Sequence, residues 1–363
     1  MSILFKPIEI NGMIVPNRLV RSATNDRRAD TSGRVNDEFI AAYEALAKGG
    51  VGLIVTGHAY VMRNGKASPT MLGVYDDSLL PGLERLVDTV HQYESRLVMQ
   101  INHAGRQTSS SFIGEIPVAP SPLYYPMTQE SPRELIDEDI EEVIEAYGAA
   151  AGRAVAAGFD GVQIHAAHGY LISQFISPYT NTRDDRWGGS LENRMRFLLE
   201  VYRRVRKEVG DDYPLMIKLN SADYIEGGLT IDESSQIAKT LSQEGIDAIE
   251  ISGGMAETSN WIFKAGIKEE KEEAYFYPNA RRFKEVIDVP LILVGGLRTP
   301  GLMERLLEHG EADMISLCRP FIREPDLVNR WKLGDQKKAD CISCNGCQKY
   351  RDQPVRCIQL DAK

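Results

Sequence analysis

The chain has 363 residues, of which 43% are hydrophobic, and a formal net charge of −10. This length suits one large barrel or two ordinary domains, and the acidic balance argues against nucleic acid as a partner. No segment is long and apolar enough to span a membrane, and the N-terminal residues lack the pattern of a secretory signal, so we expect a cytoplasmic protein without a disulfide framework.

The predicted elements begin with a small β-hairpin over residues 5–17, centred on Asn11-Gly12. Short runs follow that are mostly continuously apolar, as parallel strands covered on both sides require. These strands are expected at residues 18–24, 51–57, 96–102, 161–165, 214–220, 248–254, 290–296 and 314–318. Amphipathic helices lie between them, and three with recognisable ends cover residues 36–50, 137–158 and 230–245.

Eight successive strand–helix units predict the α/β class and a TIM (β/α)8 barrel, with an open doubly wound sheet as the alternative. We expect the barrel over residues 1–334, with the hairpin closing its floor, and a short Cys-rich tail over residues 335–363. Two long loops, at residues 104–136 and 166–190, are expected to build the active site.

The chemistry of such a barrel takes place at the C-terminal ends of its strands. The segment VGGLRTPGLMERLL (294–307) places Gly295 and Gly296 between a strand and a helix, where backbone N–H groups can hold an anion. Arg319, after the last strand, could add a forked donor. The pattern predicts a phosphate site; the alternative is a tight turn, with Arg319 paired to a carboxylate.

His165, His168 and Tyr170 follow the fourth predicted strand. On a helix the two histidines would share a face and could bind metal, but no third ligand follows at suitable spacing. We favour histidines that donate hydrogen bonds to a developing oxyanion, with Tyr170 delivering a proton. A metal pair and histidines with a purely structural role remain alternatives.

The segment HAAHGYLISQFISPYTNTRDDRWGGSLENR (165–194) resembles the signature of the Old Yellow Enzyme family of FMN-dependent oxidoreductases. The resemblance extends through PNRLVRSAT, GGVGLIVTG, MQINHAGR and ADMISLCRPFIREPDL, and covers about residues 3–330. It implies a TIM barrel with FMN at its mouth. NAD(P)H would reduce the flavin, and hydride would then pass from flavin N5 to the Cβ of an α,β-unsaturated carbonyl compound.

The resemblance also implies a role for each matching residue. His165 and His168 match the pair that binds the carbonyl oxygen, and Tyr170 matches the proton donor to Cα. Lys218 falls where the family has a cation near flavin N1 and O2, with a core salt bridge as the alternative reading. Asn25 stands where many members carry Thr or Cys. The other positions implied to contact the cofactor are Ser22, Ala23, Thr24, Gly57, Gln100, Gly295, Gly296, Cys318 and Arg319.

The tail contains Cys341, Cys344, Cys347 and Cys357, spaced C-x2-C-x2-C-x9-C. This pattern favours an iron–sulfur cluster of the 4Fe–4S type over zinc, and a reduced tail without metal is the alternative. It resembles the cluster motif of the 2,4-dienoyl-CoA reductase and trimethylamine dehydrogenase branch, with different spacing. The sequence ends at Lys363, so we expect any cluster to exchange electrons with a separate redox protein.

These observations favour an FMN-dependent ene-reductase that uses NAD(P)H on an enone, enal or unsaturated thioester. The alternatives are an iron–sulfur-linked flavoenzyme of the dienoyl-CoA reductase or amine dehydrogenase type and, from another class, a metal-dependent barrel lyase. No G-x-G-x-x-G opens a helix after a strand, so we expect the nicotinamide to visit the substrate pocket. Trp261, Phe263, Tyr275 and Phe276 are expected to wall an apolar ligand. The substrate, the preferred nicotinamide, an electron-transfer partner and a homo-oligomer remain open.

Overall fold

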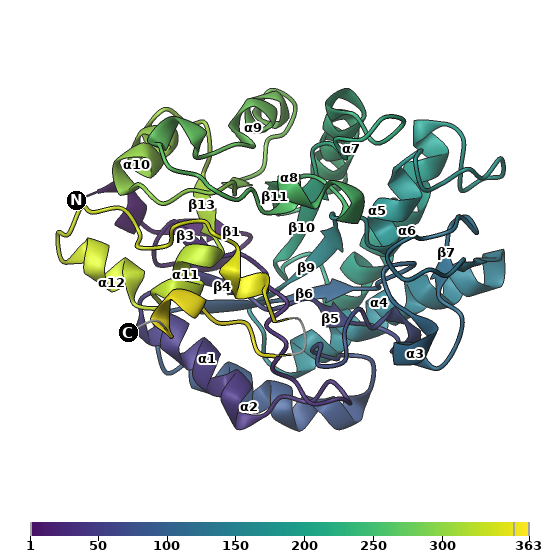
Figure 1. Cartoon of the computed structure of the whole chain (residues 1–363), viewed down its shortest axis with the longest axis horizontal. Coiled ribbons are helices and arrows are strands. Elements are labelled where there is room, and N and C mark those ends of the chain that lie inside the picture. The colour runs from purple at the N-terminus through teal and green to yellow at the C-terminus, as the bar shows by residue number, and fades with distance from the viewer. Residues whose placement is uncertain (1, 351–352, 362–363) are drawn as a thin grey trace.

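The computed structural model describes residues 2–350 and 353–361, and it contains a closed barrel of parallel strands surrounded by helices (Figure 1). The strands follow chain order around the barrel, and the pairing of the last with the first closes it. They are β3 (Leu19–Arg21), β4 (Leu53–Val55), β6 (Arg96–Asn102), β9 (Gly161–Ala166), β10 (Leu215–Asn220), β11 (Ala248–Ser252), β12 (Leu291–Leu293) and β13 (Met314–Leu317). The predicted TIM barrel is confirmed, and the alternative prediction of an open doubly wound sheet is wrong.

The outer layer consists of helices, several of which begin at residues suited to capping. The Asn36 side chain accepts a hydrogen bond from the Phe39 N–H at 2.9 Å, and Thr230 forms a reciprocal capping box with Glu233. The helices are α1 (Asp37–Lys48), α2 (Leu80–Val90), α3 (Ser110–Ile113), α4 (Asp137–Ala156), α5 (Leu171–Ile176), α6 (Leu191–Val209), α7 (Ile231–Glu244), α8 (Ser259–Ile262), α9 (Tyr277–Lys284), α10 (Pro300–Glu308), α11 (Arg319–Arg323) and α12 (Leu327–Lys332). Two-residue strands β5 (Ala59–Tyr60), β7 (Val118–Ala119) and β8 (Arg133–Glu134) complete the fold.

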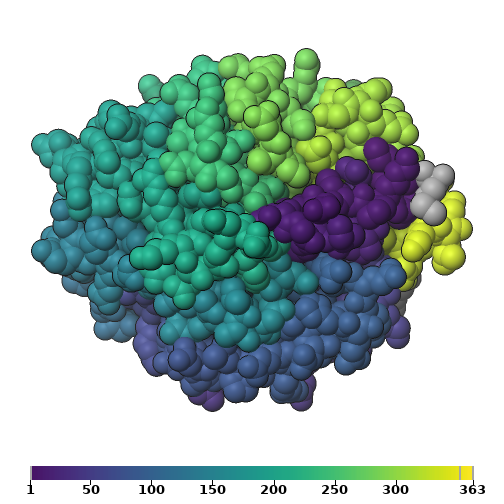
Figure 2. All heavy atoms as spheres, turned by 180° about the vertical axis from the view of Figure 1, so that it is seen from behind, coloured from purple at the N-terminus to yellow at the C-terminus, as the bar shows by residue number. Residues whose placement is uncertain are grey.

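The predicted N-terminal hairpin is present and closes the floor of the barrel. Strands β1 (Ile8–Ile10) and β2 (Met13–Val15) pair antiparallel, and both turn residues, Asn11 and Gly12, have positive φ. Ile10, Met13 and Val15 are buried in one cluster with apolar residues of the barrel strands. Figure 2, the view from behind, shows this N-terminal segment in purple lying across that face.

The Cys-rich tail lies against the barrel. The N–H of Ala339 donates to the Arg298 carbonyl at 2.9 Å, and the N–H of Val355 donates to the Asp26 carbonyl at 3.0 Å. The proposed boundary between residues 334 and 335 stays a prediction. Within the described residues, no helix combines the length and apolarity needed to cross a bilayer.

Candidate active site

A cavity of about 440 Å³ opens where the barrel strands end. It brings together most of the residues singled out from the sequence. Those that line it are Ser22, Ala23, Thr24, Asn25, Gln100, His165, His168, Tyr170, Lys218, Gly296, Cys318 and Arg319. The cavity is therefore built from residues far apart in the chain, at the end of the barrel where TIM-barrel chemistry takes place.

The two histidines and the tyrosine form a tight group. His165 is the second-last residue of β9, and its ring centroid lies 5.2 Å from that of His168 and 4.9 Å from that of Tyr170. His168 and Gly169 have φ values of 63° and 77°, so the chain turns sharply before α5 starts. The helical arrangement that would let both histidines bind a metal is therefore not formed.

Both imidazoles are neutral near pH 7. Burial, followed by the charges of neighbouring groups, lowers the pKa of His165 and of His168 well below the usual value. The Ala167 N–H donates to His165 Nδ1 at 3.2 Å, which leaves the ring proton of His165 on Nε2. The Ser252 hydroxyl lies 2.7 Å from His168 Nε2 and can hold that nitrogen as an acceptor. Each ring then retains one N–H to donate.

His58, which the sequence analysis missed, is the third histidine of this group. It follows β4, lines the cavity, and has its Nε2 atom 3.5 Å from the Tyr170 hydroxyl. Its Nδ1 atom lies 3.0 Å from the Asn102 amide nitrogen. Burial lowers the pKa of His58 to about 4 and raises the pKa of Tyr170 to about 12. Tyr170 is therefore a protonated phenol beside a neutral imidazole.

Lys218 forms the core salt bridge that was its alternative reading and also borders the cavity, and its place beside a flavin stays a prediction. Its Nζ atom lies 2.9 Å from Glu250 Oε1 and 2.8 Å from Ser22 Oγ, and the side chain also lines the cavity. Glu250 was not predicted, although a carboxylate inside the apolar run AIEIS is a signal, because a buried charge needs a partner. The core salt bridge and a cation at the cavity are thus one arrangement.

The residues of the predicted anion site follow β12 and β13, and Arg298 lies beside them on the cavity. Gly296 has φ +73°, and a Cβ there would come within 2.2 Å of Ile267 Cδ1. Arg298 is only 4% exposed and lines the cavity, and its Nε and Nη2 atoms donate no hydrogen bond to any described residue. Its Nη1 atom donates to the Cys341 carbonyl at 2.9 Å. The Nε atom lies 3.7 Å from Glu273 Oε1, beyond hydrogen-bond distance, so both N–H groups are able to bind an acceptor in the cavity.

Of three further residues implied to contact the cofactor, Arg319 lines the cavity, whereas Gly295 and Gly57 do not. Arg319 lines the cavity and donates from Nη1 to the Lys264 carbonyl at 2.8 Å and to Asn345 Oδ1 at 2.6 Å. Gly295 does not line the cavity; its carbonyl accepts from the Tyr275 N–H. Gly57 does not line it either, because a Cβ there would meet the Thr24 carbonyl at 2.4 Å instead. Gly57 permits two backbones to pack closely, and its contact with the cofactor stays a prediction.

The four tail cysteines border one small cavity of about 20 Å³ beside Arg319 and Arg323. Such a set of thiols has the chemistry that an iron–sulfur cluster needs. The four thiols are nevertheless not close enough to act together as ligands. The described part of the chain contains no group of three or more ligating side chains that could hold a metal ion. Burial raises the pKa of Cys341, and raises that of Cys347 to about 12, so both are thiols as they stand.

The long loops and the tail form the rim. Gln107 and Met127 from residues 104–136, and Ser343, Asn345 and Gln348 from the tail, line the cavity. Of the four aromatic residues expected there, Phe263 and Tyr275 line it, while Trp261 stacks on Tyr224 and Phe276 is in the core.

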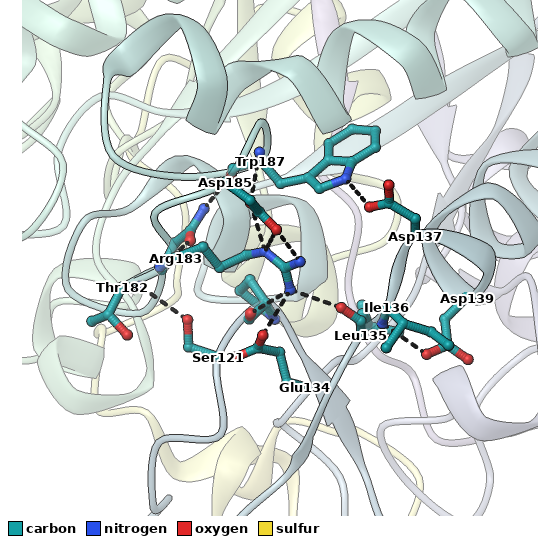
Figure 3. A network of polar contacts seen from close by, with 12 residues as sticks. Ser121, Glu134, Leu135, Ile136, Asp137, Asp139, Thr182, Arg183, Asp185 and Trp187 are labelled. Atoms are coloured by element: carbon teal, nitrogen blue, oxygen red, sulfur yellow. Dashed lines mark hydrogen bonds and ion pairs between the residues drawn. The ribbon is translucent and has the colours of Figure 1, made fainter.

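The NTRDDRW segment that dominates the sequence motif serves the rim and lies outside the cavity lining. Arg183 donates to the carbonyls of Leu135 and Pro120 at 2.7 and 3.0 Å and pairs with Asp185 (Figure 3). Trp187 donates from Nε1 to Asp137 at 2.7 Å in the same network. These bonds fasten the segment after β9 to the segment after β6, and so fix two walls of the cavity.

Comparison with known proteins points in one direction. A model of the NADH:flavin oxidoreductase / NADH oxidase family matches residues 3–338. An NADH oxidase of Thermoanaerobacter brockii is 38% identical over 361 residues, 98% of this chain and 55% of that protein. An NADPH dehydrogenase of Clostridium acetobutylicum is 35% identical over 326 residues, 90% of this chain and 93% of that protein.

A solved structure of 2-naphthoyl-CoA reductase with 2-naphthoyl-CoA is similar with a TM-score of 0.91 and 35% identity, over 98% of this chain and 56% of that one. The chain spans about half the length of that reductase and of the NADH oxidase. It spans nearly the whole of the NADPH dehydrogenase.

Proposed function

The chain belongs to the NADH:flavin oxidoreductase / NADH oxidase family, as its motifs predicted, and from this we propose that it is an FMN-dependent NAD(P)H oxidoreductase that reduces activated alkenes. The observation that carries the proposal is the group of His165, His168 and Tyr170, two neutral N–H donors beside a protonated phenol in one cavity. The substrate class is an enone, enal or unsaturated thioester.

The residues around the cavity fit FMN. The buried Nε and Nη2 groups of Arg298, which donate no hydrogen bond to any described residue, suit the phosphate, and Arg319 lies on the same cavity. Lys218 and Gln100 would face the flavin ring, with Ser22, Ala23, Thr24 and Asn25 along its edge, a set that stays a prediction. When bound, FMN would supply the hydride chemistry between NAD(P)H and the β-carbon of the alkene.

The chain's own groups then handle the carbonyl and the proton. The N–H groups of His165 and His168 bind the carbonyl oxygen, which gains negative charge as the β-carbon is reduced. Tyr170 holds its proton at Oη until that stage, because burial keeps its pKa near 12, and it then protonates the α-carbon. After this transfer the phenolic oxygen of Tyr170 is negatively charged, and His58 Nε2, 3.5 Å away, stabilises that charge.

Tyr170→Phe tests this proposal by separating the two half-reactions. The phenol has no task in flavin reduction, so stopped-flow reduction of the bound flavin by NADPH and by NADH should keep its rate. Reoxidation by an enone such as 2-cyclohexenone should slow by about 10²–10⁴-fold, the usual contribution of a general acid. Equal loss in both half-reactions, or no loss in either, would contradict the proton-donor role.

A second candidate function follows from the tail. Four thiols on one cavity fit a 4Fe–4S cluster in their chemistry, and zinc is the less favoured occupant. The chain would then act as an iron–sulfur-linked flavoenzyme that exchanges electrons with a partner protein. Anaerobically purified protein should contain about four iron and four sulfide per chain, and Cys344→Ser should lower both. Iron-free protein with full NADPH turnover would exclude this candidate.

A further inference from the structure

Glu250 is the most completely buried charged residue at the heart of the barrel, and the chemistry proposed above leaves it without a task. Its exposed fraction is 0%, and it does not line the cavity. It sits on β11 in register with Lys218 on β10, which is itself in register with His165 on β9. The carboxylate therefore lies within the barrel, one strand from the cation and two from the catalytic histidine.

Every contact of the carboxylate leads toward the cavity. Oε1 accepts from Lys218 Nζ at 2.9 Å and from the hydroxyls of Ser22 and Ser316, each at 2.8 Å. Oε2 accepts from Gln163 Nε2 at 3.0 Å. Gln163 Oε1 in turn accepts from Gln100 Nε2 at 2.6 Å. One carboxylate thus orients Lys218 and Ser22 directly and Gln100 through an amide.

The group is ionised in spite of its burial. Burial alone would raise the pKa of Glu250, but the Lys218 ammonium and the hydrogen bonds together lower it below the usual value. Breaking such a buried pair leaves an uncompensated charge, whereas removing both charges can be tolerated. The pair accordingly presents a nearly neutral unit to the cavity, although Lys218 alone would present a full positive charge.

We propose that Glu250 is a positioning residue that sets the redox potential of the bound flavin by neutralising Lys218. A cation beside the flavin pyrimidine edge favours the reduced ring, which carries negative charge there, and so raises the potential. A carboxylate 2.9 Å from that cation opposes the effect. The inference rests on the proposed function only in requiring FMN in the cavity, and it is independent of the substrate.

The test is the midpoint potential of the FMN-loaded protein, measured by spectroelectrochemical titration. Glu250→Gln keeps the shape and removes the charge, and it should shift the equilibrium toward reduced flavin at least tenfold, a rise of about 30 mV for two electrons. Lys218→Met should lower the potential. The double variant should return close to the wild-type value, because it restores a neutral unit.

Glu273→Gln is the matched control. Glu273 is likewise a buried carboxylate near a cation, 3.7 Å from Arg298 Nε, but it accepts from the backbone N–H groups of Arg298 and Thr299, at 2.8 and 3.0 Å. Its loss should move the potential less than the loss of Glu250. A Glu250→Gln protein that is fully loaded and has the wild-type potential would overturn the inference, as would shifts of the same sign in Glu250→Gln and Lys218→Met.

Loss of flavin from Glu250→Gln would also be decisive. If an unpaired Lys218 is the cause, Lys218→Met/Glu250→Gln should regain FMN affinity, measured by quenching of FMN fluorescence. If Glu250 only supports the fold, the double variant should bind FMN no better, and the inference fails. If the variants show the expected shifts in potential but the wild-type protein turns over no enone, the proposed function is refuted and this inference stands.

Discussion

Removal of the Arg298 guanidinium tests the phosphate end of the cavity most directly. The side chain is 4% exposed, and its Nε and Nη2 groups have no hydrogen-bond acceptor among the described residues. Hydrogen bonds to a charged group contribute about 1.5–3 kcal/mol each. Two bonds at the lower end give about 3 kcal/mol, which weakens the Kd for FMN about a hundredfold in Arg298→Met.

The assay is fluorescence titration of the apoprotein with FMN and, in parallel, with riboflavin, which lacks the phosphate. Arg298 also donates to the Cys341 carbonyl and lies 3.7 Å from Glu273, so the riboflavin titration is the control for a disturbance of the protein itself. A general disturbance would weaken both ligands alike. We expect the loss for FMN alone. Equal losses for the two flavins, or an FMN affinity within twofold of wild type, would refute the reasoning.

Two further predictions concern stability. His58 has a folded-state pKa of about 4, below the usual value of about 6.5, so the unfolded chain binds the proton first as the pH falls. The contribution of this group to the free energy of unfolding is therefore fully present above pH 6.5 and declines below it, by about 2 kcal/mol between pH 7 and pH 5. His58→Gln should reduce the acid sensitivity of urea unfolding by that amount. Unchanged sensitivity would contradict the pKa assigned to His58. Thr230→Ala removes the acceptor that caps α7 and should cost about 1 kcal/mol in urea unfolding, with no change in FMN affinity; wild-type stability would show that the cap is immaterial.

The barrel could be predicted from the sequence because its signals are local. Each strand is a short apolar run that is buried on both faces of the sheet. Capping residues such as Asn36 and Thr230 mark where helices begin. The hairpin was readable from Asn11-Gly12, whose positive φ values suit a two-residue turn. His165 and Lys218 could be assigned to the cavity because both lie within the last three residues of barrel strands.

The missed residues depend on contacts between distant segments. His58 is one histidine after a glycine, and nothing nearby in the sequence indicates that the Tyr170 hydroxyl lies 3.5 Å from it. Arg298 stands in the VGGLR segment, but the sequence does not show that its Nε and Nη2 groups are buried in the folded chain without a hydrogen-bond acceptor among the described residues. The close packing at Gly57 has the same origin, because the neighbour that forbids a side chain there is the carbonyl of Thr24, in a different segment.

The wall that Ser343, Asn345 and Gln348 contribute to the main cavity has a practical consequence for protein engineering. Libraries designed to alter substrate range usually vary the loops that follow barrel strands, and here they would omit part of the binding surface. A chimera that exchanges only the barrel would inherit foreign pocket residues from the donor of the C-terminal segment. Design of new specificity in this scaffold has to treat residues 341–348 and the barrel loops as a single recombination unit.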